Sequence, residues 1–229
     1  MSKRNKLQRF AQILSFPNVY ENFDPLKPDL AGKDGELVEM KGKWREKHFQ
    51  NDNPITLELA CGKGHYTLGL AKMYPERNFI GVDIKGARIW RGAKTALEDK
   101  MQNVAFLRTR IEQIANFFEE GEISEIWITF PDPFLAKENR RMTAPRFLAS
   151  YKKILVPNGI LNLKTDSPEF YEFTQESIAA SPDFELNFED DDIYAKPLPM
   201  PELDIKTEYE GKHLAAGKTI KYLKAILRK

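Results

Sequence analysis

Short apolar segments alternate with amphipathic segments from residue 55 onwards. The apolar segments predict strands at 55–59, 78–84, 104–109, 125–130, 159–165, 184–189 and 219–227. The segments between them predict helices at 65–73, 85–100, 111–118, 144–155 and 170–180. Strands that alternate with helices are typical of a doubly wound α/β fold with a mostly parallel sheet. The last two strands have no predicted helix between them, so we expect an antiparallel late strand.

Residues 17–54 lack this alternation. They carry the prolines and glycines typical of turns, and a short strand is expected near 36–40. We therefore predict a basic N-terminal extension, residues 1–54, and a main domain, residues 55–229. The chain of 229 residues is long enough to bury a core without disulfides, and its single cysteine, Cys61, excludes an intramolecular one.

Charge is balanced in sum but unevenly distributed. The chain has 35 Lys and Arg against 34 Asp and Glu, a formal net charge of +1. Seven acids and no base lie between Glu176 and Ala195. Basic residues gather in three clusters: Lys3, Arg4, Lys6 and Arg9; Lys137, Arg140, Arg141, Arg146, Lys152 and Lys153; and Lys212, Lys218, Lys221, Lys224, Arg228 and Lys229. Such clusters indicate a basic face for nucleic acid, with solvated helix faces as the alternative.

Several classes of protein do not fit this composition. No apolar run approaches the ~20 residues of a membrane span, and the basic N-terminus lacks the apolar stretch of a signal peptide. The three histidines are too widely spaced for a Cys/His zinc site. We therefore expect a cytoplasmic protein with no membrane partner and no metal, either a monomer or a homodimer.

The segment ELACGKG joins the first strand to the first helix. Its small residues Ala60, Gly62 and Gly64 favour close approach of a ligand to backbone amides. Glu58 is an acid inside an apolar strand, and Asp83 ends the second strand, where doubly wound folds place an acid that binds ribose hydroxyls. A nicotinamide site prefers G-x-G-x-x-G, whose third glycine is here Thr67. The segment instead resembles the E/D-x-G-x-G-x-G opening of S-adenosylmethionine-dependent methyltransferases, with Ala60 in place of the first glycine.

The segment ITFPDPF follows the fourth strand of the main domain. Asp132 lies just past the carboxyl end of that strand, where open α/β sheets bind ligands. Pro131 and Pro133 restrict the backbone around Asp132, and Phe134 is available to stack on a base. The segment resembles the D/N-P-P-Y/F/W motif of amino-group methyltransferases. A rigid loop in which the aspartate caps a turn is the alternative.

Two later segments complete a family pattern. TD (Thr165–Asp166) and TEYE (Thr207–Glu210) follow FPDPF and its basic residues in order. Together with LELACGKG and Asp83 they resemble the bacterial tRNA (guanine-N7-)-methyltransferase family over about residues 55–227. The resemblance implies a Rossmann-like class I methyltransferase sheet, the cofactor S-adenosyl-L-methionine, and the formation of 7-methylguanosine at position 46 in the variable loop of tRNA.

The resemblance also implies roles for individual residues. Asp132 falls on the catalytic position. The expected cofactor-binding residues are Glu58, Ala60, Gly62, Gly64, Asp83, Arg110, Ile111 and Asp132. Arg110 replaces a family acid near the end of the third strand, so the backbone of Arg110 and Ile111 is expected to contact the adenine. The expected tRNA-binding residues are Lys137, Asp166, Thr207, Glu208, Tyr209 and Glu210.

The expected chemistry needs few protein groups. Guanine N7 carries a free lone pair and has no proton to lose. A fixed carboxylate such as Asp132 stabilises the positive charge that develops on the ring. Asp166 or Glu208 is suited to accept hydrogen bonds from guanine N1–H and N2–H. Alternatives are a polar turn for TEYE, a helix cap for TD, a methyltransferase that acts on another amino or amide nitrogen, and a tRNA-binding protein without turnover.

Overall fold

The computed structural model describes residues 3–228, with the side chains of residues 3–6 left out. It consists of two compact units, Met1–Glu119 and Glu120–Lys229. The side chains of Lys3, Arg4 and Lys6, and the whole of Lys229, belong to the predicted basic clusters but lie outside the described part. The expected domain boundary after residue 54 stays a prediction.

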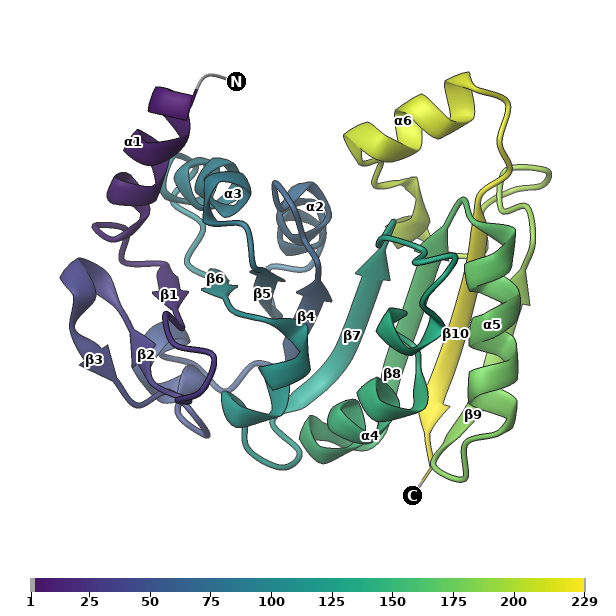
Figure 1. Ribbon diagram of the computed structural model, residues 1–229, viewed down its shortest axis with the longest axis horizontal. Coiled ribbons are helices and arrows are strands. Elements are labelled where there is room, and N and C mark those ends of the chain that lie inside the picture. The colour runs from purple at the N-terminus through teal and green to yellow at the C-terminus, as the bar shows by residue number, and fades with distance from the viewer. Residues whose placement is uncertain (1–2, 229) are drawn as a thin grey trace. The chain divides into compact units, whose positions relative to one another are not determined.

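The first unit contains a mostly parallel sheet with the strand order β3-β2-β1-β6-β5-β4 (Figure 1). Its strands are β1 (Val19–Glu21), β2 (Leu30–Ala31), β3 (Leu37–Val38), β4 (Ile55–Leu59), β5 (Asn78–Asp83) and β6 (Val104–Arg108). Its helices are α1 (Lys3–Ile13), α2 (His65–Met73) and α3 (Gly86–Glu98), with the short turns η1 (Lys33–Gly35), η2 (Arg45–Phe49) and η3 (Ile111–Asn116). Strand β1 pairs in parallel with β6, so part of the predicted extension continues the sheet.

The second unit contains strands in the order β7-β8-β10-β9. They are β7 (Ile123–Thr129), β8 (Leu155–Thr165), β9 (Phe184–Asp190) and β10 (Lys221–Leu227). The helices are α4 (Pro145–Ile154), α5 (Pro168–Ala179) and α6 (Glu208–Ala215), with the short turns η4 (Glu138–Arg140) and η5 (Pro201–Asp204). Strand β10 is antiparallel to both β8 and β9, which confirms the expected antiparallel late strand.

Helix α6 lies between β9 and β10, where no helix was predicted. The hydroxyl of Thr207 accepts a hydrogen bond from the backbone N–H of Glu210 at 3.1 Å, so TEYE forms the N-cap and first turn of this helix. The spacing T-x-x-E is that of a capping box. The expectation that no helix lies between these two strands was therefore wrong. The T-x-x-E spacing was the signal in the sequence for this helix.

The ring of Phe106 on β6 fixes how closely α2 and α3 approach the sheet. A Cβ atom added at Gly64, Gly81 or Gly92 would lie 2.7–2.8 Å from atoms of this ring. Such a distance is shorter than any van der Waals contact, so a side chain at these positions requires the ring to move. Phe106 thereby sets the position of the turn that precedes α2.

Candidate active site

The turn between β4 and α2 in the first unit has an unusual backbone. Ala60, Gly62 and Gly64 have φ values of 58°, 57° and 71°. The N–H of Cys61 donates to the carbonyl of Val82 at 3.0 Å, which anchors the turn to β5. Glycine adopts positive φ without strain, whereas an L-residue such as Ala60 has a cost of roughly 1–2 kcal/mol. Alanine in place of glycine at position 60 therefore matters through the backbone conformation and not through the size of the side chain.

Asp83 at the end of β5 lies directly against this turn. One carboxylate oxygen accepts from the N–H of Gly62 at 2.9 Å, and the other accepts from the N–H of Lys85 at 2.7 Å. Each carboxylate oxygen offers two lone-pair directions, so both oxygens retain capacity for a ribose hydroxyl. A Cβ at Gly62 would meet no atom within 4 Å, which leaves room for a ligand beside the carboxylate. The turn and Asp83 therefore fit the nucleoside part of S-adenosylmethionine.

Asp83→Ala is expected to weaken the binding of S-adenosylhomocysteine by roughly 1.5–3 kcal/mol, because charge-assisted hydrogen bonds are lost. Binding of tRNA should change less. Titration calorimetry measures the first quantity, and Asp99→Ala is the matched control, since Asp99 pairs with Lys72 at the surface. An unchanged affinity in a folded Asp83→Ala protein would remove Asp83 from the cofactor site.

Glu58 on β4 is buried and faces the start of α2. Its Oε2 accepts from the backbone N–H of Thr67 at 2.7 Å and also from the Thr67 hydroxyl. These bonds provide the partners that a buried carboxylate needs. In the sequence, Thr67 was noted only because it stands where a nicotinamide site has its third glycine. The unexplained acid in an apolar strand was the signal that a donor at the next helix N-terminus would face it.

The other residues near this turn have distinct environments. Cys61 is buried, and burial raises the pKa of its thiol, with the carboxylates of Glu58 and Asp83 adding to the effect. Cys61 is accordingly a turn residue and not a thiolate nucleophile. Arg110 is exposed, and its carbonyl accepts from the N–H of Gln113 in η3 at 2.9 Å. Ile111 is half-buried. The adenine contact expected at Arg110 and Ile111 stays a prediction.

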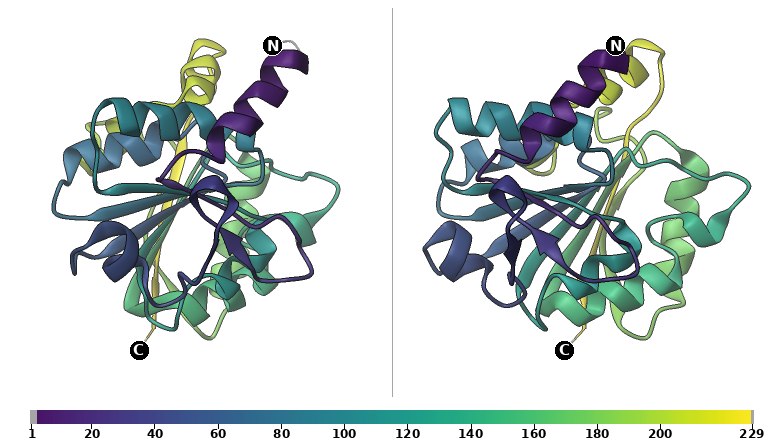
Figure 2. Two further views of the ribbon diagram at one scale, coloured as in Figure 1. Left: turned by 90° about the vertical axis from the view of Figure 1, so that its left-hand side faces the viewer. Right: turned by 60° about the vertical axis from the view of Figure 1, so that its left-hand side comes forward.

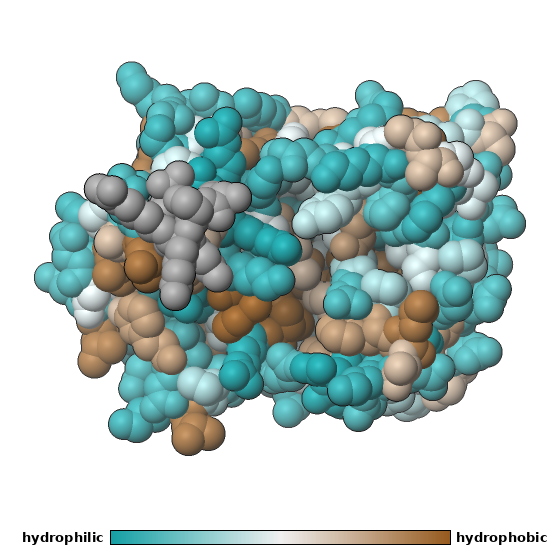
Figure 3. All heavy atoms as spheres, turned by 45° about the horizontal axis from the view of Figure 1, so that its top comes forward, coloured by the Kyte–Doolittle hydropathy of each residue, from teal (hydrophilic) through white to brown (hydrophobic). Residues whose placement is uncertain are grey.

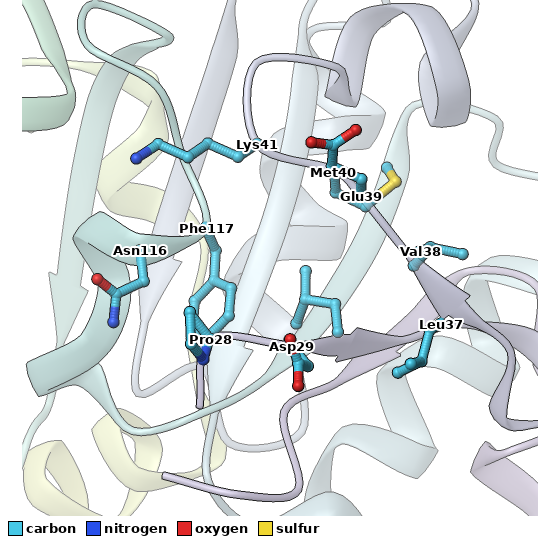
Figure 4. A pocket seen from close by; sticks show the side chains of 10 residues that line it. Pro28, Asp29, Leu37, Val38, Glu39, Met40, Lys41, Asn116 and Phe117 are labelled. Atoms are coloured by element: carbon cyan, nitrogen blue, oxygen red, sulfur yellow. The ribbon is translucent and has the colours of Figure 1, made fainter. Parts of the chain in front are cut away.

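A pocket elsewhere in the first unit does not involve these residues. It has a volume of about 380 Å³ and lies between the β2–β3 hairpin and the end of η3 (Figure 4). Its lining comes from residues 28–30, 37–41 and 116–117. None of the residues expected to bind the cofactor lines it, so the pocket does not bear on the assignment above.

In the second unit, the loop that follows β7 presents Asp132 to solvent. Oδ1 of Asp132 accepts from the N–H of Phe134 at 3.1 Å. Phe130 and Phe134, on either side, have φ values of 48° and 42°. The N–H of Phe130 donates to the carbonyl of Lys164 on β8 at 2.8 Å. The loop is thus an aspartate-capped turn tied to the sheet, and the carboxylate is held in place while remaining exposed.

Arg141 anchors the far side of this loop. It is buried, its Nε donates to the carbonyl of Pro133 at 3.0 Å, and its Nη1 pairs with Glu138 at 3.3 Å. Lys137 is exposed, and its N–H donates to the carbonyl of Phe134 at 2.9 Å. Arg141 was predicted as part of a basic cluster on the surface, but its guanidinium is buried and binds groups of this loop. Lys221 is likewise buried, with its ammonium bonded to the Thr219 hydroxyl at 2.6 Å.

Helix α6 is joined to β8 by a buried ion pair. The ammonium of Lys164 lies 2.7 Å from Oε1 of Glu210, and neither side chain is accessible to solvent. The same oxygen accepts from the hydroxyl of Tyr194 at 2.7 Å, and Lys164 also donates to the carbonyl of Leu203 at 2.7 Å. Burial lowers the pKa of Lys164, and the carboxylate of Glu210 opposes this effect. The place of Glu210 among the tRNA-binding residues stays a prediction, since its side chain lies inside the unit.

Asp166 follows β8 and contacts α6 and the segment after it. Its Oδ2 lies 3.2 Å from Nδ1 of His213 and also accepts from the ammonium of Lys218. The imidazole of His213 stacks on Phe130 at 5.9 Å between ring centroids. Asp166 and the Asp132 loop are thus linked through His213 within the second unit. Lys218 was predicted only as part of a basic cluster, and no motif in the sequence marks His213 as a partner of Asp166.

Three further predicted residues lie on α6 or at its start. Thr207 caps the helix, as described above. Glu208 and Tyr209 are exposed, and the ammonium of Lys212 lies 5.9 Å from the centre of the Tyr209 ring. Glu208 and Tyr209 are therefore the members of TEYE that a macromolecule can contact without rearrangement of α6. Among residues 3–228 no group of His, Cys, Asp and Glu is arranged to hold a metal ion, and no helix is long and apolar enough to cross a membrane.

A mostly parallel α/β sheet, a glycine-containing turn after β4 and an acid at the end of β5 are the nucleoside-binding arrangement of doubly wound folds, and the comparisons with known proteins assign the chain to the class I S-adenosylmethionine-dependent methyltransferases. Residues 52–223 match the model of a family described as putative methyltransferase. The tRNA (guanine-N(7)-)-methyltransferase of Bacteroides fragilis is 47% identical over 98% of this chain and 86% of its own length. The enzyme of the same name from Christiangramia forsetii is 45% identical over 98% of both chains. The chain belongs to the tRNA (guanine-N(7)-)-methyltransferase family.

Solved structures support the fold. The 16S rRNA methyltransferase KamB superposes with a TM-score of 0.66 at 13% identity, over 85% of this chain and 97% of KamB. The antibiotic-resistance methyltransferase Kmr gives a TM-score of 0.60 at 15% identity, over 85% of this chain and 96% of Kmr. These similarities confirm the predicted class I methyltransferase fold.

Proposed function

We propose that this chain transfers the methyl group of S-adenosylmethionine to N7 of a guanosine in tRNA, at position 46 of the variable loop, in the cytoplasm. Near full-length identity of 45–47% to tRNA (guanine-N(7)-)-methyltransferases carries the proposal. The positive φ values of the turn after β4 and the open space beside Gly62 and the Asp83 carboxylate support it.

The first unit provides the cofactor-binding groups. The carboxylate of Asp83 would accept hydrogen bonds from the ribose hydroxyls, and the open space beside Gly62 would admit the ligand. Glu58 holds the start of α2 through Thr67. When bound, S-adenosylmethionine supplies an electrophilic methyl group on its sulfonium.

The second unit provides the groups that act on guanosine. N7 has a free lone pair, so the attack needs no general base. Methylation leaves a positive charge on the imidazole ring, and Asp132 stabilises that charge as it develops. The anchored, exposed carboxylate suits this role because it needs little reorganisation when charge appears.

Recognition of guanine requires acceptors for N1–H and N2–H. Asp166, held through Oδ2, and the exposed Glu208 are the acidic groups that we assign to this task. Adenine lacks this pair of donors, so the same carboxylates discriminate against it. Lys137, in the segment after Asp132, and Tyr209, next to Glu208, are exposed and are assigned to the tRNA backbone and bases.

The experiment is methylation of bulk tRNA with tritiated S-adenosylmethionine, followed by nucleoside analysis. We expect label in 7-methylguanosine, and none in a tRNA transcript whose guanosine 46 is replaced by adenosine. Label in the protein or in methyladenosine would support another nitrogen methyltransferase. Binding of tRNA without any label would indicate a protein that has lost turnover.

A further inference from the structure

Helix α3 in the first unit has a basic exposed face. From Ile84 to Leu97 the sequence contains four basic residues and no acid. Lys85, Arg88 and Arg91 are exposed, and Lys94 pairs with Glu98 at 2.8 Å. The opposite face is small and apolar and is buried; it consists of Gly86, Ala87, Ile89, Gly92, Ala93 and Ala96. This basic run belongs to none of the clusters that the sequence analysis identified.

The basic residues at the start of α3 oppose the helix dipole, whereas the carboxylate of Asp83, which accepts from the N–H of Lys85, offsets part of their charge. The first turn contains no acid, while Lys85 immediately precedes the helix and Arg88 lies in its first turn. Acidic residues are favoured at this end of a helix, and cations are unfavourable there. The arrangement therefore adds fixed positive charge to an end that is already positive. Basic residues at a position where the local preference is for acids are typical of a functional surface.

Helix α1 extends the same face. Its Arg9 guanidinium lies 4.3 Å from the ring centre of Trp90 on α3, and Lys94 lies 5.7 Å from that ring. The indole N–H of Trp90 donates to the side chain of Gln12 at 2.7 Å. Figures 1 and 2 show α1 lying beside α3. Hydrophilic side chains predominate on the side of the molecule shown in Figure 3.

We propose that Arg9, Lys85, Arg88 and Arg91, the α1–α3 basic face, bind the phosphate backbone of the tRNA substrate. This proposal rests on the proposed function, which makes tRNA the partner. The apolar side of α3 packs on β5 and β6, so it is not available to insert into a lipid surface. The face begins beside Asp83, whose carboxylate accepts from the N–H of Lys85. RNA phosphates bound there lie next to the cofactor-binding end of the first unit.

The test replaces two exposed arginines of α3. Arg88→Gln/Arg91→Gln should lower the magnitude of the slope of log affinity for tRNA against log salt by about 1.4–1.8, because each lost phosphate contact removes ~0.7–0.9. Between about 50 and 200 mM KCl, the loss of affinity should then be roughly tenfold smaller than in the wild type. The matched control, Lys33→Gln/Lys41→Gln, removes the same charge beside the acidic hairpin residues Asp29, Asp34, Glu36 and Glu39 and should keep the wild-type slope.

Two further measurements separate this proposal from the proposed function. Binding of S-adenosylhomocysteine and the circular dichroism spectrum should be unchanged in the arginine variant, which shows that fold and cofactor site are intact. An unchanged slope of log affinity against log salt in that variant, or an equal decrease of the slope in the control, would refute the binding of tRNA phosphates by the α1–α3 basic face. Formation of 7-methylguanosine by the wild-type protein tests the proposed function independently of either outcome.

Discussion

Asp132→Asn is expected to lower the single-turnover rate of methyl transfer by ~10²–10³-fold, the usual effect of removing one preorganised electrostatic group. Asparagine keeps an oxygen that accepts the N–H of Phe134, so the loop should retain its conformation. The charge that faces the developing cation is lost. Affinities for S-adenosylhomocysteine and tRNA should stay close to wild type, which restricts the effect to the chemical step.

Glu138→Gln serves as the control for this experiment. Glu138 is an exposed acid in the same segment, and it pairs with Arg141. Removal of its charge should leave the rate within about threefold of wild type, since Glu138 itself is exposed and Arg141 keeps its bond to the carbonyl of Pro133. A rate within threefold of wild type for Asp132→Asn itself would reduce Asp132 to a structural turn residue and refute its catalytic assignment.

Lys164→Met is expected to destabilise the folded protein by about 3–5 kcal/mol, because it leaves the carboxylate of Glu210 buried without its cation. Both side chains are inaccessible, and Lys164 also bonds the carbonyl of Leu203. The double variant Lys164→Met/Glu210→Gln removes both charges and should recover part of the loss. Urea unfolding followed by circular dichroism measures the free energies of unfolding.

Lys218→Met is the matched control, since it breaks the pair of Lys218 with Asp166, where the lysine side chain is half exposed. Its effect should be below about 1 kcal/mol. If Lys164→Met were also below this value, the buried pair would contribute little to holding α6. If it is not, activity lost on substitution of Glu210 must be corrected for stability before it is ascribed to tRNA contact.

The sequence predicted those parts of the fold whose pattern is local. Strands β4 to β10 and helices α2 to α5 follow from the alternation of apolar and amphipathic segments, and η3 appears where a longer helix was expected. Strand β1 was missed because its three residues are too short for a periodic pattern. Helix α6 was missed because it has few hydrophobic positions, although the T-x-x-E spacing of its N-cap is present in the sequence.

The positions of two candidate site acids were predicted because strand ends determine them. Asp83 and Asp132 lie at the carboxyl ends of β5 and β7, as the rule for open α/β sheets requires. The partners of the acids could not be predicted. Thr67 faces Glu58 because a helix begins there, and Lys164 faces Glu210 because α6 packs on β8. Such pairs depend on packing between segments that are distant in sequence.

Phe106 and the glycines at 64, 81 and 92 share a single volume. No larger side chain can enter at any of these glycines while the ring stays, and a smaller residue at 106 would leave a cavity under the cofactor turn. In evolutionary terms these positions are free to change only together. An added Cβ at Gly92 would also lie 2.6 Å from the backbone carbonyl oxygen of Lys63, and Gly64 has a positive φ. A lineage with a smaller residue at 106 therefore gains room for alanine chiefly at Gly81, which pairs with Phe106 across β5 and β6 and whose other close neighbour is the Thr67 hydroxyl. The shape of the cofactor turn is then inherited through a compensating pair of residues on two adjacent strands.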